Sequence, residues 1–167
     1  MSEHRRRRSF ESGHRPKFLV VVDETPECDR AVYFAARRAV RLGASVVMLA
    51  VAEPPEDFEW LGVEDALREE AEAATEARLA AVAADIRARA GIDPEPVVRT
   101  GDRAEEILAL IEADADISFL VLGASTSKEG PGPLVVSLAD KAAAQFPIPV
   151  VIVPGGLTDA EIDALAG

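Results

Sequence analysis

The sequence predicts an α/β protein with a doubly wound, open parallel sheet of five strands, a Rossmann-like fold. From residue 17 onward, short apolar runs rich in Val, Ile and Leu alternate with longer segments of helical periodicity. Such an alternation is typical of parallel strands joined by right-handed crossovers. Most of the runs are apolar throughout, which is typical of strands covered by helices on both faces. A chain of 167 residues has the length of one domain with a single core.

The first strand covers residues 18–22, where Phe-Leu-Val-Val-Val is followed by the acidic residue Asp23. A helix is expected next, because Thr25 can cap an N-terminus and Pro26 suits the first helical turn. The apolar positions at helical spacing in this segment are Val32, Ala35, Ala36 and Ala39. Gly43 then supplies the left-handed conformation in which helices often end.

The second strand covers residues 46–51 and is wholly apolar. After an acidic, proline-rich loop, a long helix is expected over residues 64–90, ended by Gly91. Its inner stripe is expected to contain Leu67, Ala71, Ala74, Leu79, Val82 and Ile86. Residues 96–99, Pro-Val-Val-Arg, form the third strand.

The second half of the chain repeats the pattern. Asp102 can cap a helix whose apolar residues face inward. The remaining elements are a fourth strand at residues 119–122 ended by Gly123, a helix with Leu134, Leu138 and Ala142 on one face, a fifth strand at residues 149–153 and a short terminal helix at residues 158–166. Ser, Thr, Gly and Pro dominate the loop between the fourth strand and its helix.

The fold class selects a site before any motif is considered. In a doubly wound sheet, ligands bind beyond the carboxyl ends of the strands, near the point where the strand order reverses. This rule selects Asp23, the region of Val51 and the loop after residue 122. Asp23 has two interpretations: its carboxylate accepts hydrogen bonds from a ribose or an adenine amino group, or it caps the next helix and begins the turn. Its position in the sequence leaves both open.

The stretch 123–132 contains three consecutive hydroxyl residues, Ser125, Thr126 and Ser127, together with glycines and Lys128. A helix that follows such a loop presents unpaired N–H groups and a positive dipole end to anions. Small residues also allow a phosphate to approach the backbone closely. The same composition is found in ordinary surface loops with helix-capping residues. Phosphate binding and a plain surface loop are therefore the two alternatives.

Residue content excludes several kinds of chemistry. The only histidines, His4 and His14, lie near the N-terminus, so no Ser-His-Asp or Cys-His arrangement is expected in the core. The single cysteine, Cys28, leaves no soft-ligand metal site and no disulfide framework. A Mg²⁺ site made of carboxylates and phosphate oxygens stays open. Neither a P-loop nor a GxGxxG pattern is present, and we assign no catalytic residue and no metal ligand.

Two further positions have alternative interpretations. Cys28 falls in the first turn of a helix, where the dipole lowers the pKa of a thiol, while Glu27 and Asp29 oppose that effect. It is therefore either a reactive thiolate or an inert, partly buried thiol. Phe58 and Trp60 form either a lid over a base or a locally packed pair.

The formal net charge of −12 is unevenly distributed. Residues 1–16 form a basic tail that we expect to be disordered, and its cluster at residues 5–8 either contacts an anionic surface or is solvated. The remainder is acidic and repels phosphate backbones, so nucleic-acid binding is not expected. Arg7 and Arg8 are not followed by the apolar region of an export signal, and no run reaches the roughly 20 residues of a membrane span. With one cysteine, a cytoplasmic protein is expected.

Three stretches taken together resemble the universal stress protein family. Residues 18–36 resemble its first strand, acidic turn and helix, residues 100–107 the opening of its third helix, and residues 120–153 its nucleotide loop, fourth helix and last strand. The resemblance implies the strand order 3-2-1-4-5 of an adenine nucleotide alpha hydrolase-like fold. It also implies one domain over residues 17–156, with residues 157–167 as a short C-terminal extension.

Nucleotide-binding members of the family have a Gly, two residues, a second Gly, nine residues, and then a Gly followed by Ser or Thr. Gly123 matches the first glycine and Ser137 the closing hydroxyl residue. Thr126 and Val136 stand at the other two glycine positions, where a Cβ atom can block close approach or an unusual φ. The nucleotide-binding residues that the resemblance implies are Asp23, Thr25, Val51, Gly123, Ser125, Thr126 and Ser137.

The resemblance also implies a function. Asp23 would face the adenine and ribose, the Val51 backbone the adenine edge, and the loop hydroxyls the phosphates of ATP, bound with Mg²⁺. The leading hypothesis is a stress-response protein that senses ATP without efficient turnover and signals through a homodimer to a protein partner. In the implied order the apolar last strand, residues 150–153, is an edge that pairs with a second copy. The alternatives are a nucleotide-free dimeric adaptor and a slow ATP hydrolase that uses Asp23 and Mg²⁺.

Overall fold

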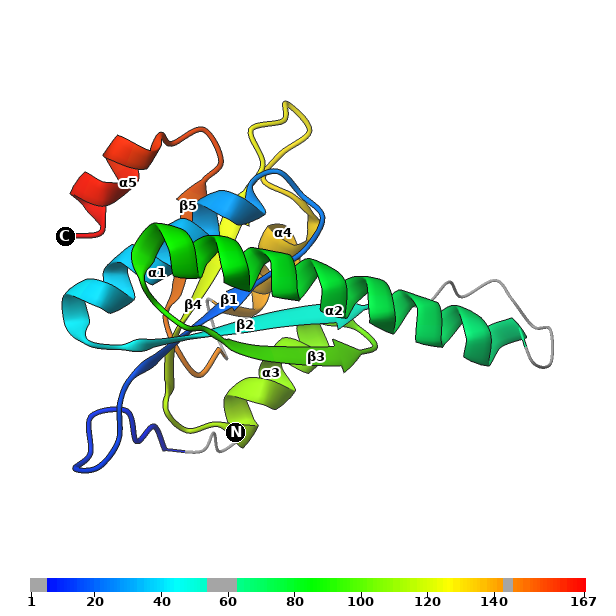
Figure 1. The fold of residues 1–167 in the computed structure, drawn as a ribbon, viewed down its shortest axis with the longest axis horizontal. Coiled ribbons are helices and arrows are strands. Elements are labelled where there is room, and N and C mark those ends of the chain that lie inside the picture. The colour runs from blue at the N-terminus through cyan, green and yellow to red at the C-terminus, as the bar shows by residue number, and fades with distance from the viewer. Residues whose placement is uncertain (1–5, 54–62, 143–145) are drawn as a thin grey trace.

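The computed structural model describes residues 6–53, 63–142 and 146–167. Helices and strands alternate along these residues, as the sequence predicts (Figure 1). In chain order they are β1 (Lys17–Val21), α1 (Cys28–Leu42), β2 (Ser45–Ala52), α2 (Val63–Ala90), β3 (Glu95–Thr100), α3 (Arg103–Ala113), β4 (Ile117–Ala124), α4 (Pro133–Ala142), β5 (Val150–Pro154) and α5 (Asp159–Leu165).

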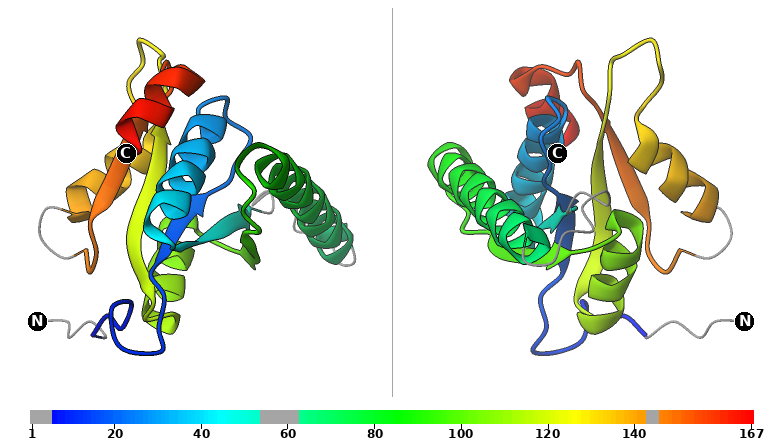
Figure 2. Two further views of the ribbon diagram at one scale, coloured as in Figure 1. Left: turned by 60° about the vertical axis from the view of Figure 1, so that its left-hand side comes forward. Right: turned by 90° about the vertical axis from the view of Figure 1, so that its right-hand side faces the viewer.

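The five strands form one parallel sheet in the order β3-β2-β1-β4-β5, which confirms the predicted fold class. Helices α1, α2 and α5 cover one face of the sheet, and α3 and α4 cover the other (Figure 2). The strand order reverses between β1 and β4. The carboxyl ends of these two strands therefore lie where a doubly wound sheet holds its ligands.

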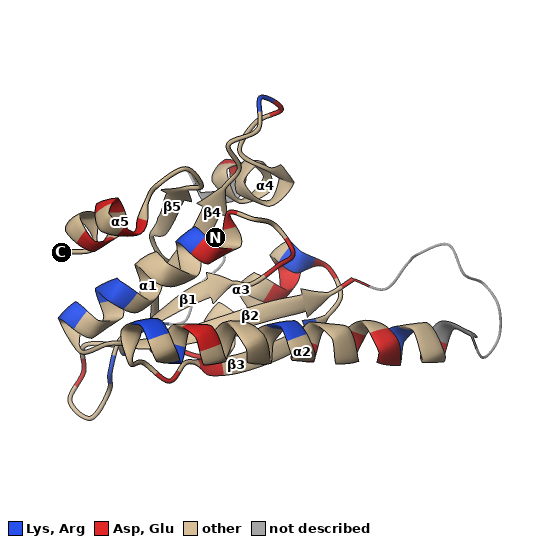
Figure 3. Ribbon diagram, turned by 45° about the horizontal axis from the view of Figure 1, so that its top comes forward, with Lys and Arg blue, Asp and Glu red and all other residues tan. Residues whose placement is uncertain are grey.

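The core consists of two apolar layers, one on each face of the sheet. Fully buried residues of the first layer include Val20, Met48, Leu79 and Ile86, and those of the second include Leu19, Leu49, Ile107 and Leu138. Neighbouring residues of one strand thus enter different layers, as predicted for strands covered on both faces. β2, β4 and β5 contain no charged residue and are tan throughout in Figure 3. None of the helices formed by the described residues is long and apolar enough to span a membrane.

The start of α1 differs from the prediction. The helix begins at Cys28 with Glu27 as its N-cap residue, and Thr25 does not cap it. Thr25 instead donates its hydroxyl to Asp23, because an aspartate can hold a turn by accepting from the residue two positions ahead. At the other end, Gly43 has a φ of 65° and ends the helix in the left-handed conformation, as predicted.

Helix α2 is longer than the strands it covers, and its N-terminal half extends beyond the carboxyl ends of β2 and β3 (Figure 1). In its C-terminal half, Leu79 and Ile86 are buried in the core, as predicted. Ala71 and Ala74, which we expected to face the core, line a cleft instead. The prediction of one continuous inner stripe is wrong for the first half, because that half runs past the end of the sheet.

The segment that precedes β1 lies at the amino ends of the strands, far from the cleft. Arg7 donates from Nη1 to the carbonyl oxygens of Ile111 (2.7 Å) and Asp114 (3.2 Å), at the C-terminus of α3. A cation at this end of a helix satisfies its last carbonyls and complements its dipole. This contact holds Arg7 against α3, whereas residues 10–15 are exposed, and the disorder of residues 1–16 stays a prediction.

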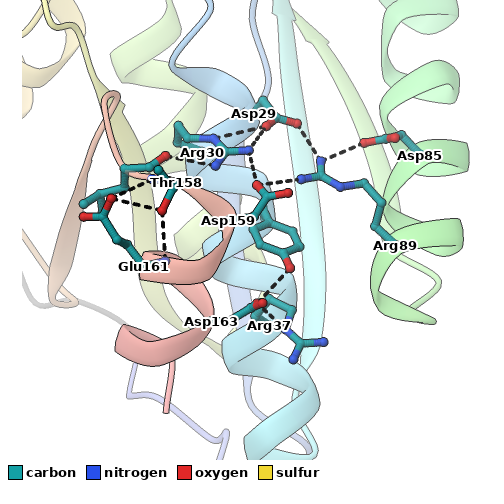
Figure 4. A network of polar contacts seen from close by, with 11 residues as sticks. Asp29, Arg30, Arg37, Asp85, Arg89, Thr158, Asp159, Glu161 and Asp163 are labelled. Carbon is teal, nitrogen blue, oxygen red and sulfur yellow. Dashed lines mark hydrogen bonds and ion pairs between the residues drawn. The ribbon is translucent and has the colours of Figure 1, made fainter.

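Helix α5 folds back onto α1, and Ile162 is completely buried there. Asp159 of α5 forms ion pairs with Arg30 of α1 (2.7 Å) and Arg89 of α2 (3.2 Å), as Figure 4 shows. Arg89 also pairs with Asp29 of α1 (2.8 Å). These four charged residues are termed the three-helix clamp. The clamp fixes the first turn of α1 between α2 and α5.

Candidate functional site

Beyond the carboxyl ends of β1, β2 and β4 lies a cleft with two connected ends. The wide end, between β1, β2 and α2, has a volume of about 420 Å³. The narrow end, between β1, β4 and α4, has a volume of about 80 Å³. Asp23, Thr25 and Arg103 line both ends and are termed the junction.

The cleft brings together four of the residues that the sequence analysis assigned to a nucleotide site. Val51 lines the wide end, Gly123 lines the narrow end, and Asp23 and Thr25 line both. These residues follow or end three strands that are far apart in the sequence. They meet because β1 lies between β2 and β4 in the sheet. The acidic turn at residue 23 and the segment after residue 122 therefore share one cleft.

The other three assigned residues lie outside this cleft. Ser125 and Ser137 line an open hollow of about 610 Å³ beside the loop between β4 and α4. Thr126 is exposed, and its Cγ2 methyl lies toward Gly155 and Gly156 in the turn that follows β5. The loop hydroxyls are thus separated from the junction.

Asp23 holds the turn between β1 and α1. Its Oδ1 atom accepts a hydrogen bond from the backbone N–H of Thr25 (2.9 Å) and a second one from the Thr25 hydroxyl. Among the described residues, no hydrogen bond reaches the other carboxylate oxygen, Oδ2. Both interpretations of Asp23 therefore fit the structure: Oδ1 shapes the turn, and Oδ2 can accept from a ligand.

Gly123 marks a close backbone contact between the end of β4 and the turn before α1. A Cβ atom at residue 123 would lie 2.3 Å from the carbonyl oxygen of Glu27, so no side chain fits there. The Cγ atom of Glu27 lies 3.2 Å from the same position. Glycine is therefore required here by a contact within the protein, whether or not a phosphate binds.

The loop between β4 and α4 satisfies many of its own hydrogen bonds. The N–H of Ser125 donates to the carbonyl oxygen of Pro131 (3.0 Å). The Ser125 hydroxyl accepts from the N–H of Ser127 (3.0 Å), and the Ser127 hydroxyl accepts from the N–H of Glu129 (3.2 Å). The backbone donors expected to meet phosphate are thus directed at oxygens of the loop itself. Figure 1 shows this loop projecting beyond the sheet.

The two departures from the glycine pattern do not strain the loop. No non-glycine residue in the described ranges has a positive φ, so Thr126 and Val136 adopt ordinary backbone conformations. The conformations that require glycine fall instead on Gly130 (φ 110°) and Gly132 (φ 111°). The loop therefore takes its shape from glycines at positions other than those of the family pattern.

The arginines of the cleft differ in how they are paired. Arg78, in the wide end, forms an ion pair with Glu24 at 2.9 Å. Arg103, the first residue of α3, has a longer contact of 3.8 Å between its Nε atom and Glu53. That Nε atom is buried and has no hydrogen-bond partner among the described residues. Buried donors without a partner are rare and often mark the place of a water or a ligand.

Glu27 brings a negative charge to the narrow end. Its half-buried side chain lines both the narrow end and the hollow beside the loop. It makes no capping hydrogen bond, although it stands at the N-cap of α1. Within the described part of the chain, no Lys, Arg or His forms an ion pair with its carboxylate. Its charge therefore acts directly on whatever enters the narrow end.

Cys28 also lines the narrow end, where its thiol stays protonated. Burial, with a smaller contribution from the nearby carboxylates of Asp23, Asp29 and Glu27, raises the pKa of this thiol to about 11. The inert interpretation of Cys28 is thus favoured over the reactive thiolate. Phe58 and Trp60, the expected lid, lie outside the described residues. Within the ranges that the structure describes, no group of three or more His, Cys, Asp or Glu side chains is placed to hold a metal ion.

Five charged residues of the cleft were not predicted from the sequence: Glu24, Glu27, Glu53, Arg78 and Arg103. Arg103 was within reach of prediction, because the predicted cap Asp102 fixes where α3 begins and so directs the next residue toward the strand ends. Arg78 reaches the cleft because α2 runs past the sheet, and no local sequence pattern predicts how far α2 extends beyond the strands. Glu27 is distinguished by a tertiary contact alone.

Comparison with known proteins gives a consistent result. Residues 14–154 match the universal stress protein family. Among solved structures, the universal stress protein UspA from Lactobacillus plantarum is similar with a TM-score of 0.68 and 17% identity, over 83% of this chain and 97% of that chain. A universal stress protein in complex with cAMP has a TM-score of 0.61 and 19% identity, with 84% and 98% covered. A universal stress protein from Archaeoglobus fulgidus in complex with dAMP has a TM-score of 0.54 and 18% identity, with 83% and 97% covered. A search of curated protein sequences finds no match.

Proposed function

The chain belongs to the universal stress protein family, and on that premise we propose that it binds and senses an adenine nucleotide in the cleft between β1, β2 and β4. The adenosine occupies the wide end, and its phosphate points through the junction toward α4. Occupancy changes the surface that a protein partner meets in a stress response. In this proposal residues 17–156 form the nucleotide-binding domain of a cytoplasmic protein, with α5 packed onto it.

One observation carries the proposal. Residues that the fold class and the resemblance select independently line a single cleft at the point where the strand order reverses. The wide end also has the mixed lining of a small-molecule site. Ala71 and Ala74 of α2 give it an apolar wall for a base, and Oδ2 of Asp23 is an acceptor for a ribose hydroxyl.

The choice of an adenine nucleotide is supported by two proteins of the same fold, whose names describe complexes with cAMP and with dAMP. ATP with Mg²⁺ is the finer form of the proposal that the family resemblance suggests. Efficient turnover is not part of it, because Oδ1 of Asp23 is engaged in the turn and the Cys28 thiol is protonated.

A nucleotide-free adaptor is the second candidate function, and the loop between β4 and α4 favours it. That loop satisfies its hydrogen bonds internally, as expected of a segment that keeps its shape without a ligand. Beside the loop, Val136 of α4 presents an apolar side chain that is 50% exposed. An adaptor would use this surface to recruit a partner directly.

Isothermal titration of the purified chain with AMP, cAMP and ATP, with and without Mg²⁺, separates the two functions. The nucleotide-sensor proposal expects one binding site for at least one of these ligands. Replacing Asp23 with Ala is expected to weaken binding about tenfold, since it removes an acceptor worth about 1.4 kcal/mol. Asp140→Ala is the matched control, because it removes a carboxylate at an exposed position of α4. Absence of binding to every ligand would favour the adaptor.

Dimerisation through β5 is the second part of the proposal. The carbonyl of Pro149 accepts from Leu120, and the N–H of Gly155 donates to Ala124, so alternate residues of β5 direct their backbone groups toward β4. By this alternation, Val150 and Ile152 direct theirs outward, where an antiparallel second copy can pair with them.

The oligomeric state follows from light scattering coupled to size-exclusion chromatography. We expect a dimer for the unmodified chain and a monomer for Ile152→Pro, which removes an outward N–H that an edge strand does not need for its own sheet. Ile152→Ala keeps that N–H and should remain dimeric. A monomeric unmodified chain at tens of micromolar would contradict this part of the proposal.

A further inference from the structure

Arg103 and Glu27 give two parts of the cleft different charges: the part beside Arg103 suits one phosphate, and the part beside Glu27 repels any further phosphate. Arg103 belongs to the junction, which borders both ends of the cleft. Glu27 stands farther along, where the narrow end meets the hollow beside the loop. A phosphate chain that leaves the wide end therefore first meets the junction, where the cation Arg103 lies near the carboxylate of Asp23, and then the carboxylate of Glu27.

Arg103 has unused capacity to bind an anion. Its buried Nε atom lacks a hydrogen-bond partner among the described residues, and its contact with Glu53 is 3.8 Å, beyond hydrogen-bond distance. A guanidinium carries five donors in a planar fork that matches a phosphate. The side chain is 28% exposed, so its remaining donors are open to the cleft. The guanidinium of Arg103 is thus available to bind a phosphate at the exit of the wide end.

Glu27 opposes further phosphates. Its Cγ atom lies 3.2 Å from the position of a Cβ atom on Gly123, so its side chain lies against the end of β4. A second or third phosphate would pass this side chain on its way to the first turn of α4. Of the described residues that line the narrow end, Arg103 is the only cation, so the carboxylate of Glu27 is not neutralised there. Like charges at short distance in a partly desolvated cleft repel strongly.

The loop before α4 offers little compensation. Helix α4 begins with Pro133, which has no N–H to donate. The donors of the preceding loop at Ser125, Ser127 and Glu129 are directed at oxygens within that loop. The narrow end itself has a volume of about 80 Å³. Within the narrow end, the loop donors and the small volume thus do not favour further phosphates, and the larger hollow beyond it also borders Glu27.

We propose that the cleft selects an adenine nucleotide with a single phosphate over ATP, with Arg103 binding that phosphate and Glu27 acting against any phosphate beyond it. This inference rests on the proposed function and names the ligand class of the same site. It makes Glu27 and Arg103 the residues that determine specificity, and neither is part of the glycine pattern.

The experiment is a titration of the full chain and its variants with adenosine, AMP and ATP, with and without Mg²⁺. The unmodified chain should bind AMP about tenfold more tightly than either adenosine or ATP. Glu27→Gln keeps the size of the side chain and should raise ATP affinity about tenfold while AMP affinity changes less than about twofold. Arg103→Ala should weaken AMP binding about tenfold or more and leave adenosine binding unchanged.

Asp140→Asn and Arg87→Ala are the controls, because they make the same charge changes at exposed positions of α4 and α2. Arg103→Lys retains the positive charge and should keep part of the AMP affinity, which separates loss of phosphate binding from loss of folding. Circular dichroism of each variant checks that the fold is intact.

Each other outcome overturns the inference in a recognisable way. ATP binding as tight as AMP binding in the unmodified chain, unchanged by Glu27→Gln, would overturn the inference and leave the proposed function standing. Mg²⁺-dependent ATP binding that Glu27→Gln weakens would also overturn it, since Glu27 would then be a metal ligand. Failure of all three ligands to bind would overturn the inference together with the proposed function.

Discussion

The wide and narrow ends of the cleft share strand β1 but are closed in different ways. Helix α2 bounds the wide end, and because it runs past the sheet it leaves a volume of about 420 Å³ beside Arg78 and Arg103. The contact between Gly123 and Glu27 bounds the narrow end, where about 80 Å³ remains beside an unneutralised carboxylate. What this cleft can hold is therefore set by the length of helix α2 and by one close backbone contact, and less by a loop motif.

The same contrast extends to what supports each end. The wide end is an opening between elements, so side chains can be added to it without disturbing the core. The narrow end depends on the position of the first turn of α1, which directly follows Glu27 and which the three-helix clamp fixes. Changes to the backbone contact that closes the narrow end should therefore act on stability, and changes to the lining of the wide end on binding.

The largest effect is expected from Gly123→Val, which destroys the contact that defines the narrow end. Its Cβ atom would lie 2.3 Å from the Glu27 carbonyl oxygen, so β4 and the turn before α1 would have to separate. We expect the free energy of unfolding to fall by about 2–3 kcal/mol, the upper part of the range for overpacking, because the clash is with backbone. Urea unfolding followed by circular dichroism measures it.

Gly156→Ala is the matched control for that variant. A Cβ atom at residue 156 would meet the Thr126 methyl at 3.6 Å, which is an ordinary contact. Its stability should stay within about 0.5 kcal/mol of the unmodified chain. Equal losses for the two variants would mean that the contact at Gly123 is not special.

The next largest effect is expected from Ala74→Leu, which fills the wide end. Ala74 is exposed and lines the cleft, so a larger side chain should leave the core undisturbed. We expect AMP binding to weaken at least about tenfold, or about 1.4 kcal/mol, with little change in the unfolding midpoint. Unchanged AMP affinity would show that the base does not lie against α2.

A smaller effect is expected from loosening the three-helix clamp. Burial acts to raise the pKa of Asp29, but hydrogen bonds from Arg30 and Arg89 outweigh it and hold the pKa below its ordinary value. A carboxyl whose pKa is lower in the folded state stabilises the fold above its unfolded pKa, and this contribution is lost as the pH falls through the folded pKa.

Asp29→Asn should therefore reduce the free energy of unfolding at neutral pH by less than about 1 kcal/mol, because the Asp29 side chain is 49% exposed and its ion pairs are partly screened by solvent. It should also reduce the loss of stability on acidification. Urea unfolding at neutral and acidic pH checks both statements. Asp140→Asn, on the exposed surface of α4, is the control. A variant curve that runs parallel to that of the unmodified chain would contradict the assigned role of Asp29.

The smallest effect is expected from restoring the family glycines with the double change Thr126→Gly and Val136→Gly. Both residues already have ordinary backbone conformations, and Thr126 faces the turn after β5. ATP affinity should rise less than about threefold, below the effect of Glu27→Gln, since the carboxylate stays in place. If the double change raises ATP affinity more than Glu27→Gln does, the loop motif, and not Glu27, determines the specificity.

The fold was predictable from the sequence because apolar periodicity determines which segments become strands covered on both faces. Sheet order needed the family resemblance, since alternation alone does not specify which strands are neighbours. Of the junction residues, Asp23 followed from the rule that ligands lie at strand ends, and Thr25 from the family resemblance. Glu27 could not be found this way, because its role depends on a contact with Gly123 about a hundred residues away in the sequence.

The loop between β4 and α4 shows a different limit. Its composition of Ser, Thr and Gly fits phosphate binding and internal hydrogen bonding equally well, and side-chain chemistry alone does not choose between them. In the structure the hydroxyls of Ser125 and Ser127 accept from the loop backbone. Local geometry, which composition does not encode, decides where those donors point.

The most direct test of the central claim is an NMR titration of the ¹⁵N-labelled chain with AMP, which reports where the ligand binds residue by residue. The account predicts that the largest amide shifts fall at Asp23, Thr25, Ala52 and Arg103, around the junction and the wide end. Shifts confined to residues 125–130 of the loop, or no shifts at saturating AMP, would contradict it.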